Sequence, residues 1–279
     1  MAGWGRTSRF PWRLVRRAVS RSGGLWLLLA LAAPGAAGAS EVGCPARMEV
    51  AETQATWFES PPASGACSLP LPPTTRYAAL SFDGEWEGSA HCGRCLRVTG
   101  PLGEVTVIVT DVCDGCPPGS LDLAPDAFAQ IANPVDGIVP IAWETVACDV
   151  GEANMQLMFE GSHQWYLKVQ VQQHRHGIAA VSVRDSEASE WTPMQRTADD
   201  HFELVDPGAF IVPLRFRIED VHGQVVETQE IAAIENDEPL DTGVQLEPCP
   251  EPGVAGSAAA GAALAGLAAR RDARRARRL

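Results

Sequence analysis

A hydrophobic run covers residues 105–110, Val-Thr-Val-Ile-Val-Thr, and ends on Asp111. Such a run of β-branched residues is typical of a buried strand. A turn rich in Cys, Gly and Pro follows, and then comes the triplet Leu-Asp-Leu at 121–123, in which Asp122 stands between two apolar side chains. Pro125 predicts the start of a short helix. Two carboxylates, Asp111 and Asp122, therefore end or flank two short strands joined by one tight loop, an arrangement that can bring both into one groove.

Other short elements surround this stretch. Alternating or β-branched segments between Gly- and Pro-rich breaks predict strands at 48–58, 95–99 and 137–147 and a helix at 125–131, while 77–82 fits a short strand or the start of a helix. The turn at 100–103 predicts a hairpin between the strand at 95–99 and the run at 105–110. We expect an all-β unit of roughly 100 residues with one helix, consistent with a small barrel.

A second β pattern begins after a short linker at 149–153. It predicts strands at 154–159, 165–172, 178–184, 191–194, 202–204, 212–219, 225–231 and 244–246. Short strands at this spacing predict a β-sandwich. The tryptophans Trp143 and Trp191 stand in strand contexts, where a large aromatic side chain is usually buried.

Both ends of the chain have the composition of targeting segments. Six arginines, a short apolar core and a small-residue stretch predict a cleaved signal peptide at 1–39, because the apolar core is too short for a membrane-spanning helix. Residues 248–279 combine Cys249, an Ala- and Gly-rich stretch and six arginines, which favours a sorting or anchoring tail over a disordered one. We therefore expect the protein to be secreted or held at the cell surface, where this tail would be the segment that contacts the membrane.

The charge between these ends restricts the partners. Residues 40–253 hold 34 acidic and 10 basic residues, a net charge of −24. Such a body repels nucleic acid and anionic polymers, so a neutral polymer is the more natural partner.

All eight cysteines follow the predicted signal peptide. The pair Cys92 and Cys95, followed after seventeen residues by Cys113 and Cys116, has a zinc-ribbon spacing. In an exported protein disulfides are the stronger interpretation, so we expect neither a metal nor another cofactor. If Cys249 belongs to the tail, seven cysteines remain and one stays unpaired.

In order and spacing, several motifs match one family. They are Leu-Arg-Val-Thr-Gly-Pro-Leu-Gly from 96, Val-Ile-Val-Thr-Asp from 107, Leu-Asp-Leu-Ala-Pro-Asp-Ala-Phe from 121, the segment 138–143, Glu-Gly-Ser-His-Gln-Trp-Tyr from 160, Val-Gln-Val from 169 and His-Phe at 201–202. Across about residues 48–247 the chain resembles bacterial expansins. The resemblance implies a mainly β fold, with a six-stranded double-psi β-barrel at 40–148 related to glycoside hydrolase family 45. An immunoglobulin-like β-sandwich at 151–247, classed as carbohydrate-binding module family 63, would follow it.

The resemblance also implies site residues. In the barrel groove the family uses a Thr, an Asp, an aromatic two residues later and an essential Asp, which fall on Thr56, Asp111, Cys113 and Asp122. Cys113 departs from the aromatic, and Trp57 or Trp86 could supply the lost sugar contact. The alternative interpretation from the residues alone is that Asp111 and Asp122 are turn and cap residues, since Asp is common at strand ends.

In the sandwich, Trp165 and Tyr166 stand where the family has a pair of cellulose-binding aromatics. Strand alternation puts Tyr166 on the outward face and leaves Trp165 open between core and surface. The family's third aromatic corresponds to Asp199.

These features lead to a functional expectation. We expect a monomer that binds cellulose or a related neutral wall glucan and loosens it without hydrolysis. A lone half-buried carboxylic acid can have a raised pKa and protonate a glycosidic oxygen, but inverting hydrolysis also needs a second carboxylate to activate water. The alternatives are a glycan-cleaving enzyme of the lytic transglycosylase or endoglucanase type acting through Asp122, and a pure binding module.

Overall fold

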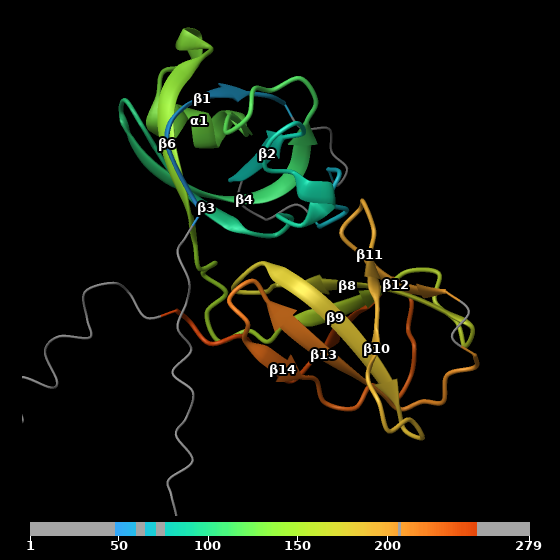
Figure 1. The fold of residues 1–279 in the computed structure, drawn as a ribbon. Coiled ribbons are helices and arrows are strands. Elements are labelled where there is room, and N and C mark those ends of the chain that lie inside the picture. Colours follow the sequence, from blue (N-terminus) through green and yellow to red (C-terminus); the bar gives the residue numbers. More distant parts are fainter. Residues whose placement is uncertain (1–47, 60–64, 71–75, 206–207, 250–279) are drawn as a thin grey trace, which may run out of the picture. The chain divides into compact units, whose positions relative to one another are not determined.

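The computed structural model of the protein describes residues 48–59, 65–70, 76–205 and 208–249. Within these residues the chain forms a closed barrel and, further along the sequence, two sheets of a sandwich (Figure 1). The expected mainly β architecture is confirmed. The predicted signal peptide and most of the predicted tail lie outside the described residues.

Six strands close the barrel. They are β1 (Glu49–Trp57), β2 (Tyr77–Ser81), β3 (Cys95–Gly100), β4 (Gly103–Cys113), β5 (Leu121–Leu123) and β6 (Val139–Val146). Their order around the barrel is β1-β5-β2-β4-β3-β6, and β6 pairs again with β1. The pairs β1–β5 and β2–β4 are parallel, and the remaining four are antiparallel. A closed mixed sheet of six strands is the barrel expected from the sequence.

The register of this sheet aligns the candidate groove residues. Thr56 of β1 pairs with Asp122 of β5, and Asp122 pairs on its other side with Ala79 of β2. Ala79 also pairs with Asp111 of β4, immediately after an irregularity in the β2–β4 register that follows Ala78. Because directly opposed residues have side chains on one face of a sheet, these residues form one row on the outer face of the barrel.

Apolar side chains on the opposite face make the barrel core. Leu121 and Leu123, the neighbours of Asp122 in sequence, are both fully buried there. The helix α1 (Pro125–Ile131) follows β5 directly, with proline in its first turn, and it buries Phe128 and Ile131 against the same core. Burial of a side chain such as Phe128 stabilises the fold by about 1.5–3 kcal/mol. The short strand β5 is therefore held firmly on its inner face, which fixes the position of Asp122 on the outer face.

Disulfides cross-link the barrel. Cys67 bonds to Cys92, Cys95 to Cys148, and Cys113 to Cys116. The zinc-ribbon alternative is therefore wrong for its four cysteines, because each contributes its sulfur to a disulfide. Cys249 is also disulfide-bonded, so it does not leave an unpaired cysteine among the described residues.

The sandwich contains two antiparallel sheets. One has the order β10-β9-β13-β14 and the other β11-β12-β8-β7-β15. The strands are β7 (Gln156–Phe159), β8 (Tyr166–Gln172), β9 (Ile178–Asp185), β10 (Thr192–Pro193), β11 (Gln195–Arg196), β12 (Phe202–Val205), β13 (Leu214–Asp220), β14 (Val225–Glu227) and β15 (Pro239–Asp241). Phe159 and Phe216, one from each sheet, are fully buried in the core between them, with ring centroids 5.8 Å apart.

Two expectations for this part of the chain were wrong. The last strand is β15, which pairs with β7, and residues 244–246 form no strand, although the carbonyl of Val244 accepts a hydrogen bond from the Met155 amide. Trp191 is half-exposed rather than buried, and the guanidinium groups of Arg184 and Arg217 lie 4.6 and 4.4 Å from its ring. Trp143 is buried as predicted, with its indole N–H donating to the Gly119 carbonyl.

The helices of the described residues are short. Besides α1 they are the 3-10 turns η1 (Glu87–Ser89) and η2 (Pro134–Asp136). Among the residues that the structure describes, no helix has the length and apolar character needed to cross a membrane.

Candidate functional site

An open groove lies over the loop that connects β4 and β5. It has a volume of about 320 Å³, and its lining residues come from β1, from the end of β4, from this loop and from β5. They are Gln54, Thr56, Cys113, Asp114, Gly115, Cys116, Pro117, Ser120, Leu121 and Asp122. Of the four positions that the resemblance assigns to the groove, it therefore contains Thr56, Cys113 and Asp122 but not Asp111.

Thr56 and Asp122 form a hydrogen-bonded pair in this groove. The Thr56 hydroxyl donates to Oδ1 of Asp122 across 2.7 Å. Desolvation raises the pKa of Asp122 above its usual range, and the hydrogen bond from Thr56 opposes that rise. The site thus holds a carboxyl group that takes up a proton more readily than a solvated aspartate does, beside a hydroxyl that fixes its orientation.

Asp111 lies apart from this groove and bonds to the backbone. Its Oδ1 accepts hydrogen bonds of 2.8 Å from the backbone amides of Ala66 and Val112, and its side chain is not among those that line the groove. A β-carbon on Gly65 would lie only 2.6 Å from Cγ of Asp111, so the loop can approach this closely because residue 65 is glycine. The carboxylate of Asp111 anchors that loop, which matches the alternative interpretation of a structural aspartate.

The two barrel tryptophans differ in exposure. Trp86 is only 6 % exposed and belongs to the barrel core, so it presents no ring to a polymer and the expectation that it binds sugar is corrected. Trp57, the residue after Thr56, is 38 % exposed, and its indole N–H donates to the Pro134 carbonyl across 3.2 Å. Trp57 remains available as an aromatic surface on the barrel.

The aromatic pair of the sandwich lies at the start of β8. Trp165 is 50 % exposed because it stands in the turn before the strand, where alternation does not direct it into the core. Tyr166 begins the strand on its outward face, and its hydroxyl donates to Oε2 of Glu203 across 3.2 Å. Desolvation, together with this carboxylate, raises the pKa of Tyr166. Both aromatics are placed where a flat polymer could contact them.

An ion-pair network surrounds Asp199, the position to which the resemblance assigns a third aromatic. Lys168, two residues beyond Tyr166 on the same face, donates to Glu160 and to Asp199 at 2.9 Å each. Burial would raise the pKa of Asp199, but hydrogen bonds from Thr197 and Lys168 outweigh it and lower the pKa to about 2. His201 lies 3.1 Å from Glu160 and 3.3 Å from Asp199. Lys168 thus already forms an ion pair with each carboxylate of this cluster, and we interpret the cluster as an ion-pair network rather than a metal site.

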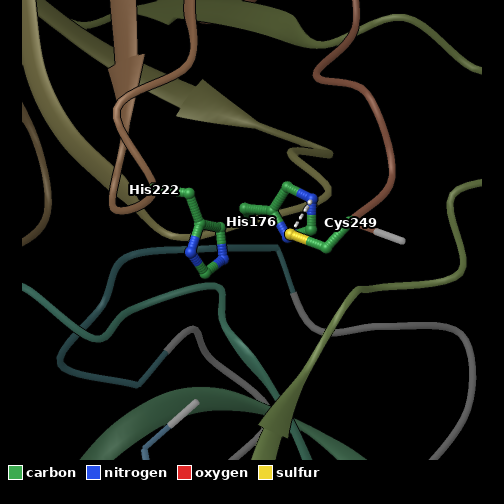
Figure 2. A group of neighbouring side chains, drawn as sticks. All are labelled: His176, His222 and Cys249. Atoms are coloured by element: carbon green, nitrogen blue, oxygen red, sulfur yellow. Dashed lines mark hydrogen bonds between the residues drawn. The ribbon is translucent and has the colours of Figure 1, made fainter. Parts of the chain in front are cut away.

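A second cluster joins two histidines and a cysteine. The side chains of His176, His222 and Cys249 point toward one another from three segments of the sandwich (Figure 2). The sulfur of Cys249 lies 3.7 Å from Nε2 of His176, and the two imidazole rings meet edge to face at 4.9 Å. Cys249 is disulfide-bonded, so its sulfur is not a thiolate ligand, and Nε2 of His176 also contacts the Glu247 carbonyl at 3.0 Å. We interpret this cluster as packing at the end of the sandwich.

The loop between β4 and β5 forms a wall of the groove that was not expected from the sequence. The signal was present, because Cys-Asp-Gly-Cys at 113–116 is a tight cysteine pair directly between the two candidate aspartates. The sequence alone does not show with which cysteine Cys113 pairs. In the structure both cysteines of this pair line the groove.

Comparisons with known proteins place the chain. A family model described as "Lytic transglycolase" matches residues 50–143, which contain most of the barrel. Expansin-YoaJ of Bacillus subtilis is 31 % identical over 180 residues, which span 63 % of this chain and 76 % of that protein.

The solved structures agree with these sequence matches. The crystal structure of apo Clavibacter michiganensis expansin superimposes with a TM-score of 0.64 and 31 % identity, covering 72 % of this chain and 99 % of that one. A mutant of the same expansin, solved in complex with cellohexaose, matches with a TM-score of 0.64 and 30 % identity over the same shares. From the barrel, the sandwich and these relatives together, the chain belongs to the expansin family.

Proposed function

We propose that this protein binds cellulose or a related neutral wall glucan and loosens it without hydrolysis. The observation that carries the proposal is the pair of Thr56 and Asp122 in an open groove, with the carboxyl half-buried and hydrogen-bonded at 2.7 Å. Membership of the expansin family supports the glucan as ligand, since a Clavibacter member was solved with cellohexaose. The net charge of −24 over residues 40–253 favours a neutral polymer over an acidic one.

The groove and the sandwich have separate tasks in this proposal. Trp165 and Tyr166 stack on the apolar faces of sugar rings and hold the polymer, as aromatic side chains do in carbohydrate sites. Asp122, when protonated, donates a hydrogen bond to an oxygen of the glucan, and Thr56 keeps the carboxyl oriented. These bonds compete with the hydrogen bonds between neighbouring glucan chains, and separation of those chains is the loosening step.

Hydrolysis is not part of the proposal. An inverting mechanism needs a second carboxylate that activates water. The Asp111 carboxylate accepts two backbone N–H groups, so it is occupied as an anchor. Asp114 is the other carboxylate that lines the groove, and it is exposed on the loop at the rim. Asp114 is therefore the residue to test if any bond is cleaved.

We further propose that the protein acts outside the cell as a monomer. Three disulfides within the described barrel are typical of an oxidising compartment and rare in the cytosol. Expansins act on extracellular walls, which agrees with the signal peptide expected at 1–39. Residues 248–279 would then attach the protein to the cell surface.

Replacement of Asp122 by Asn tests the central residue. We expect wild-type protein to weaken cellulose filters without releasing reducing ends. Asp122→Asn should lose about tenfold or more of this loosening, because an amide N–H is a weaker hydrogen-bond donor than the O–H of a carboxylic acid. Binding to insoluble cellulose through the sandwich should stay within twofold. Asp83→Asn, an exposed aspartate that does not line the groove, is the matched control and should loosen like the wild type.

Two outcomes would reject the proposal. Unchanged loosening by Asp122→Asn would remove the groove from the mechanism and leave a binding module. Release of reducing ends from cellulose, or of anhydro sugars from peptidoglycan, that is lost in Asp122→Asn would instead establish a glycan-cleaving enzyme. A parallel loss of reducing ends in Asp114→Asn would identify an inverting pair of carboxylates.

A further inference from the structure

The disulfide between Cys113 and Cys116 lies against the key carboxyl group. The two sulfur atoms and a carboxylate oxygen of Asp122 are all within 4.8 Å of one another, and both cysteines line the groove. The other disulfides of the described barrel are hidden, with all four of their cysteines less than 9 % exposed, whereas Cys113 and Cys116 are half-exposed. This disulfide is therefore the barrel's cross-link that a ligand in the groove would meet.

Its position in the chain indicates a local role. It joins residues three positions apart, compared with 25 and 53 positions for the two hidden disulfides. The stabilisation that a disulfide gives by restricting the unfolded chain grows with loop length, so this one contributes least to global stability. What it does constrain is the start of the loop between β4 and β5, which forms one side of the groove.

Contacts on both sides of the disulfide attach it to β2. The Ser81 hydroxyl donates to the Cys116 carbonyl at 2.8 Å, and the Phe82 amide donates to the Cys113 carbonyl at 3.1 Å. Gly115, between the cysteines, has a φ of +85°, which glycine adopts without strain. The sulfurs are thus presented by a tight, well-anchored turn rather than by a loose segment.

We propose that the Cys113–Cys116 disulfide is the sugar-contacting wall of the groove and a positioning element for Asp122, so that the groove binds glucan more tightly while this disulfide is closed. The inference rests on the proposed glucan-binding function and adds this disulfide to the features that determine the groove's affinity for glucan. The closed turn supplies a polarisable, weakly hydrated surface at the position where related proteins have an aromatic ring. It also limits water around the Asp122 carboxyl.

Opening of the wall is an ordinary thiol–disulfide exchange. A thiolate of an external dithiol attacks one sulfur, the Cys113–Cys116 bond breaks, and a mixed disulfide forms with the other cysteine leaving as a thiolate. The second thiol of the reagent then displaces the first cysteine. The protein ends with two thiols after protonation, and the reagent becomes a cyclic disulfide.

Groove binding should be measured without the contribution of the sandwich. The background protein is therefore Trp165→Ala/Tyr166→Ala, and the probe is cellohexaose in isothermal titration calorimetry. Three proteins are compared in this background. The first keeps Cys113 and Cys116 and is called the native pair, and the other two carry Cys113→Ala/Cys116→Ala and Cys113→Tyr/Cys116→Ala. The last restores an aromatic at position 113 without any disulfide.

We expect Cys113→Ala/Cys116→Ala to bind cellohexaose about fivefold more weakly, the loss of roughly one good contact, and Cys113→Tyr/Cys116→Ala to recover most of that loss. Treatment with dithiothreitol should weaken the native pair by a similar factor and leave both double variants unchanged. Both double variants keep the other disulfides, including that of the partly exposed Cys249. An unchanged affinity of these variants after dithiothreitol would therefore show that reduction of the other disulfides does not affect cellohexaose binding. Peptide mapping after alkylation identifies the cysteines that were reduced.

A second readout separates positioning from simple unfolding. This readout uses the chain with Trp165 and Tyr166 intact. If the disulfide limits water around Asp122, the pH midpoint of loosening should be lower in Cys113→Ala/Cys116→Ala than in the wild type. The circular dichroism spectrum of this variant should stay native. Equal cellohexaose affinity of the native pair and Cys113→Ala/Cys116→Ala, or an unshifted pH midpoint, would overturn the inference. The proposed function itself would be contradicted by a different result. In that case the native pair would not bind cellohexaose and the wild-type chain would not loosen cellulose.

Discussion

Asp111 and Asp122 are the register partners of the same residue, Ala79 of β2, one on each side of that strand. Despite this equivalence they have different partners. Asp122 accepts a hydrogen bond from the Thr56 hydroxyl inside the groove, and Asp111 accepts two from backbone amides outside it. The β2–β4 pairing has a register irregularity next to Asp111, whereas the β2–β5 pairing beside Asp122 has none. Such irregularities redirect side chains, which explains why the two carboxylates have different partners. Two similar carboxylates thus divide into one groove residue and one structural anchor.

The first prediction concerns Asp111 as an anchor. Asp111→Ala leaves the amides of Ala66 and Val112 without their acceptor, which should cost about 1–3 kcal/mol of unfolding free energy. Asp111→Asn keeps a carbonyl acceptor and should cost less than half as much. Urea unfolding measures both, and loosening per folded molecule should stay close to that of the wild type. A tenfold loss of loosening in a stably folded Asp111→Asn would return Asp111 to the mechanism.

The second prediction concerns the pH dependence of stability at Asp122. Its pKa is raised in the folded protein, mainly by desolvation, so the fold favours the protonated carboxyl. The resulting stabilisation is complete below the unfolded-state pKa and is lost as the pH rises through the folded-state pKa. Asp122→Asn cannot ionise, so it should raise the Tm relative to the wild type by about 2 °C at pH 7 and by less at pH 3. A gain that is larger at pH 3 would show that the ionised form is the favoured one.

The third prediction separates the hydroxyl of Thr56 from its shape. Thr56→Val removes the donor that lowers the pKa of Asp122, so that pKa should rise further, and the protonated form should persist to higher pH. The pH at which loosening falls to half should therefore increase, and Thr56→Ser, which keeps the hydroxyl, should stay close to the wild type. The free energy of unfolding at pH 7 should fall by about 1 kcal/mol in Thr56→Val. Identical pH profiles for Val and Ser at this position would remove the hydroxyl from the proposed mechanism.

The barrel was largely predictable because its strands are short and strongly patterned. The run at 105–110, the triplet at 121–123 and the helix start at Pro125 each carry a local signal, and the structure has elements at all three places. The strand β4 extends three residues past the predicted end, to Cys113, because β2 continues to pair with it there. Such an extension depends on a neighbouring strand that is distant in sequence.

For some residues, the neighbouring sequence does not indicate whether the side chain is buried or what it contacts. Trp86 stands among Glu and Gly residues, which indicate an exposed loop, yet the loop folds its ring into the core. For Asp111 the deciding partner is the amide of Ala66, 45 positions earlier in the chain. The pairing of Cys113 with Cys116 was one of many possible connectivities, and only the fold selects it.

The fourth prediction contrasts a surface tryptophan with a core tryptophan. Trp165→Ala removes a half-exposed ring from the turn before β8, so it should weaken binding to insoluble cellulose by about fivefold or more while changing the Tm little. Trp86→Ala removes a buried ring and should cost about 3–5 kcal/mol of stability without a specific effect on the sandwich. Cellulose pull-down and thermal unfolding of both variants measure the contrast. Normal binding by Trp165→Ala would place the polymer on another surface.

The fifth prediction concerns Asp199, the position to which the family resemblance assigns a third aromatic. Asp199 here forms an ion pair with Lys168, which lies two residues from Tyr166 on the same face of β8. If a line of aromatics determines affinity for a straight glucan, Asp199→Tyr should extend the contact surface and strengthen cellulose binding by about threefold to tenfold. Its cost in stability should be small, because the side chains of Asp199 and Glu160 are 40 % and 52 % exposed and Lys168 keeps its contact with Glu160.

The control for this gain is Asp199→Asn, which removes the charge of residue 199 without adding a ring. It should bind cellulose like the wild type. If Asn gives the same gain as Tyr, the carboxylate of Asp199 was repelling the ligand, and the wild-type surface would then suit a glycan with positively charged or hydrogen-bonding substituents better than cellulose. If both variants bind cellulose more weakly, the pair of Lys168 and Asp199 is itself a contact for the natural glycan, and a panel of insoluble glycans at two salt concentrations would identify it by the salt dependence of binding.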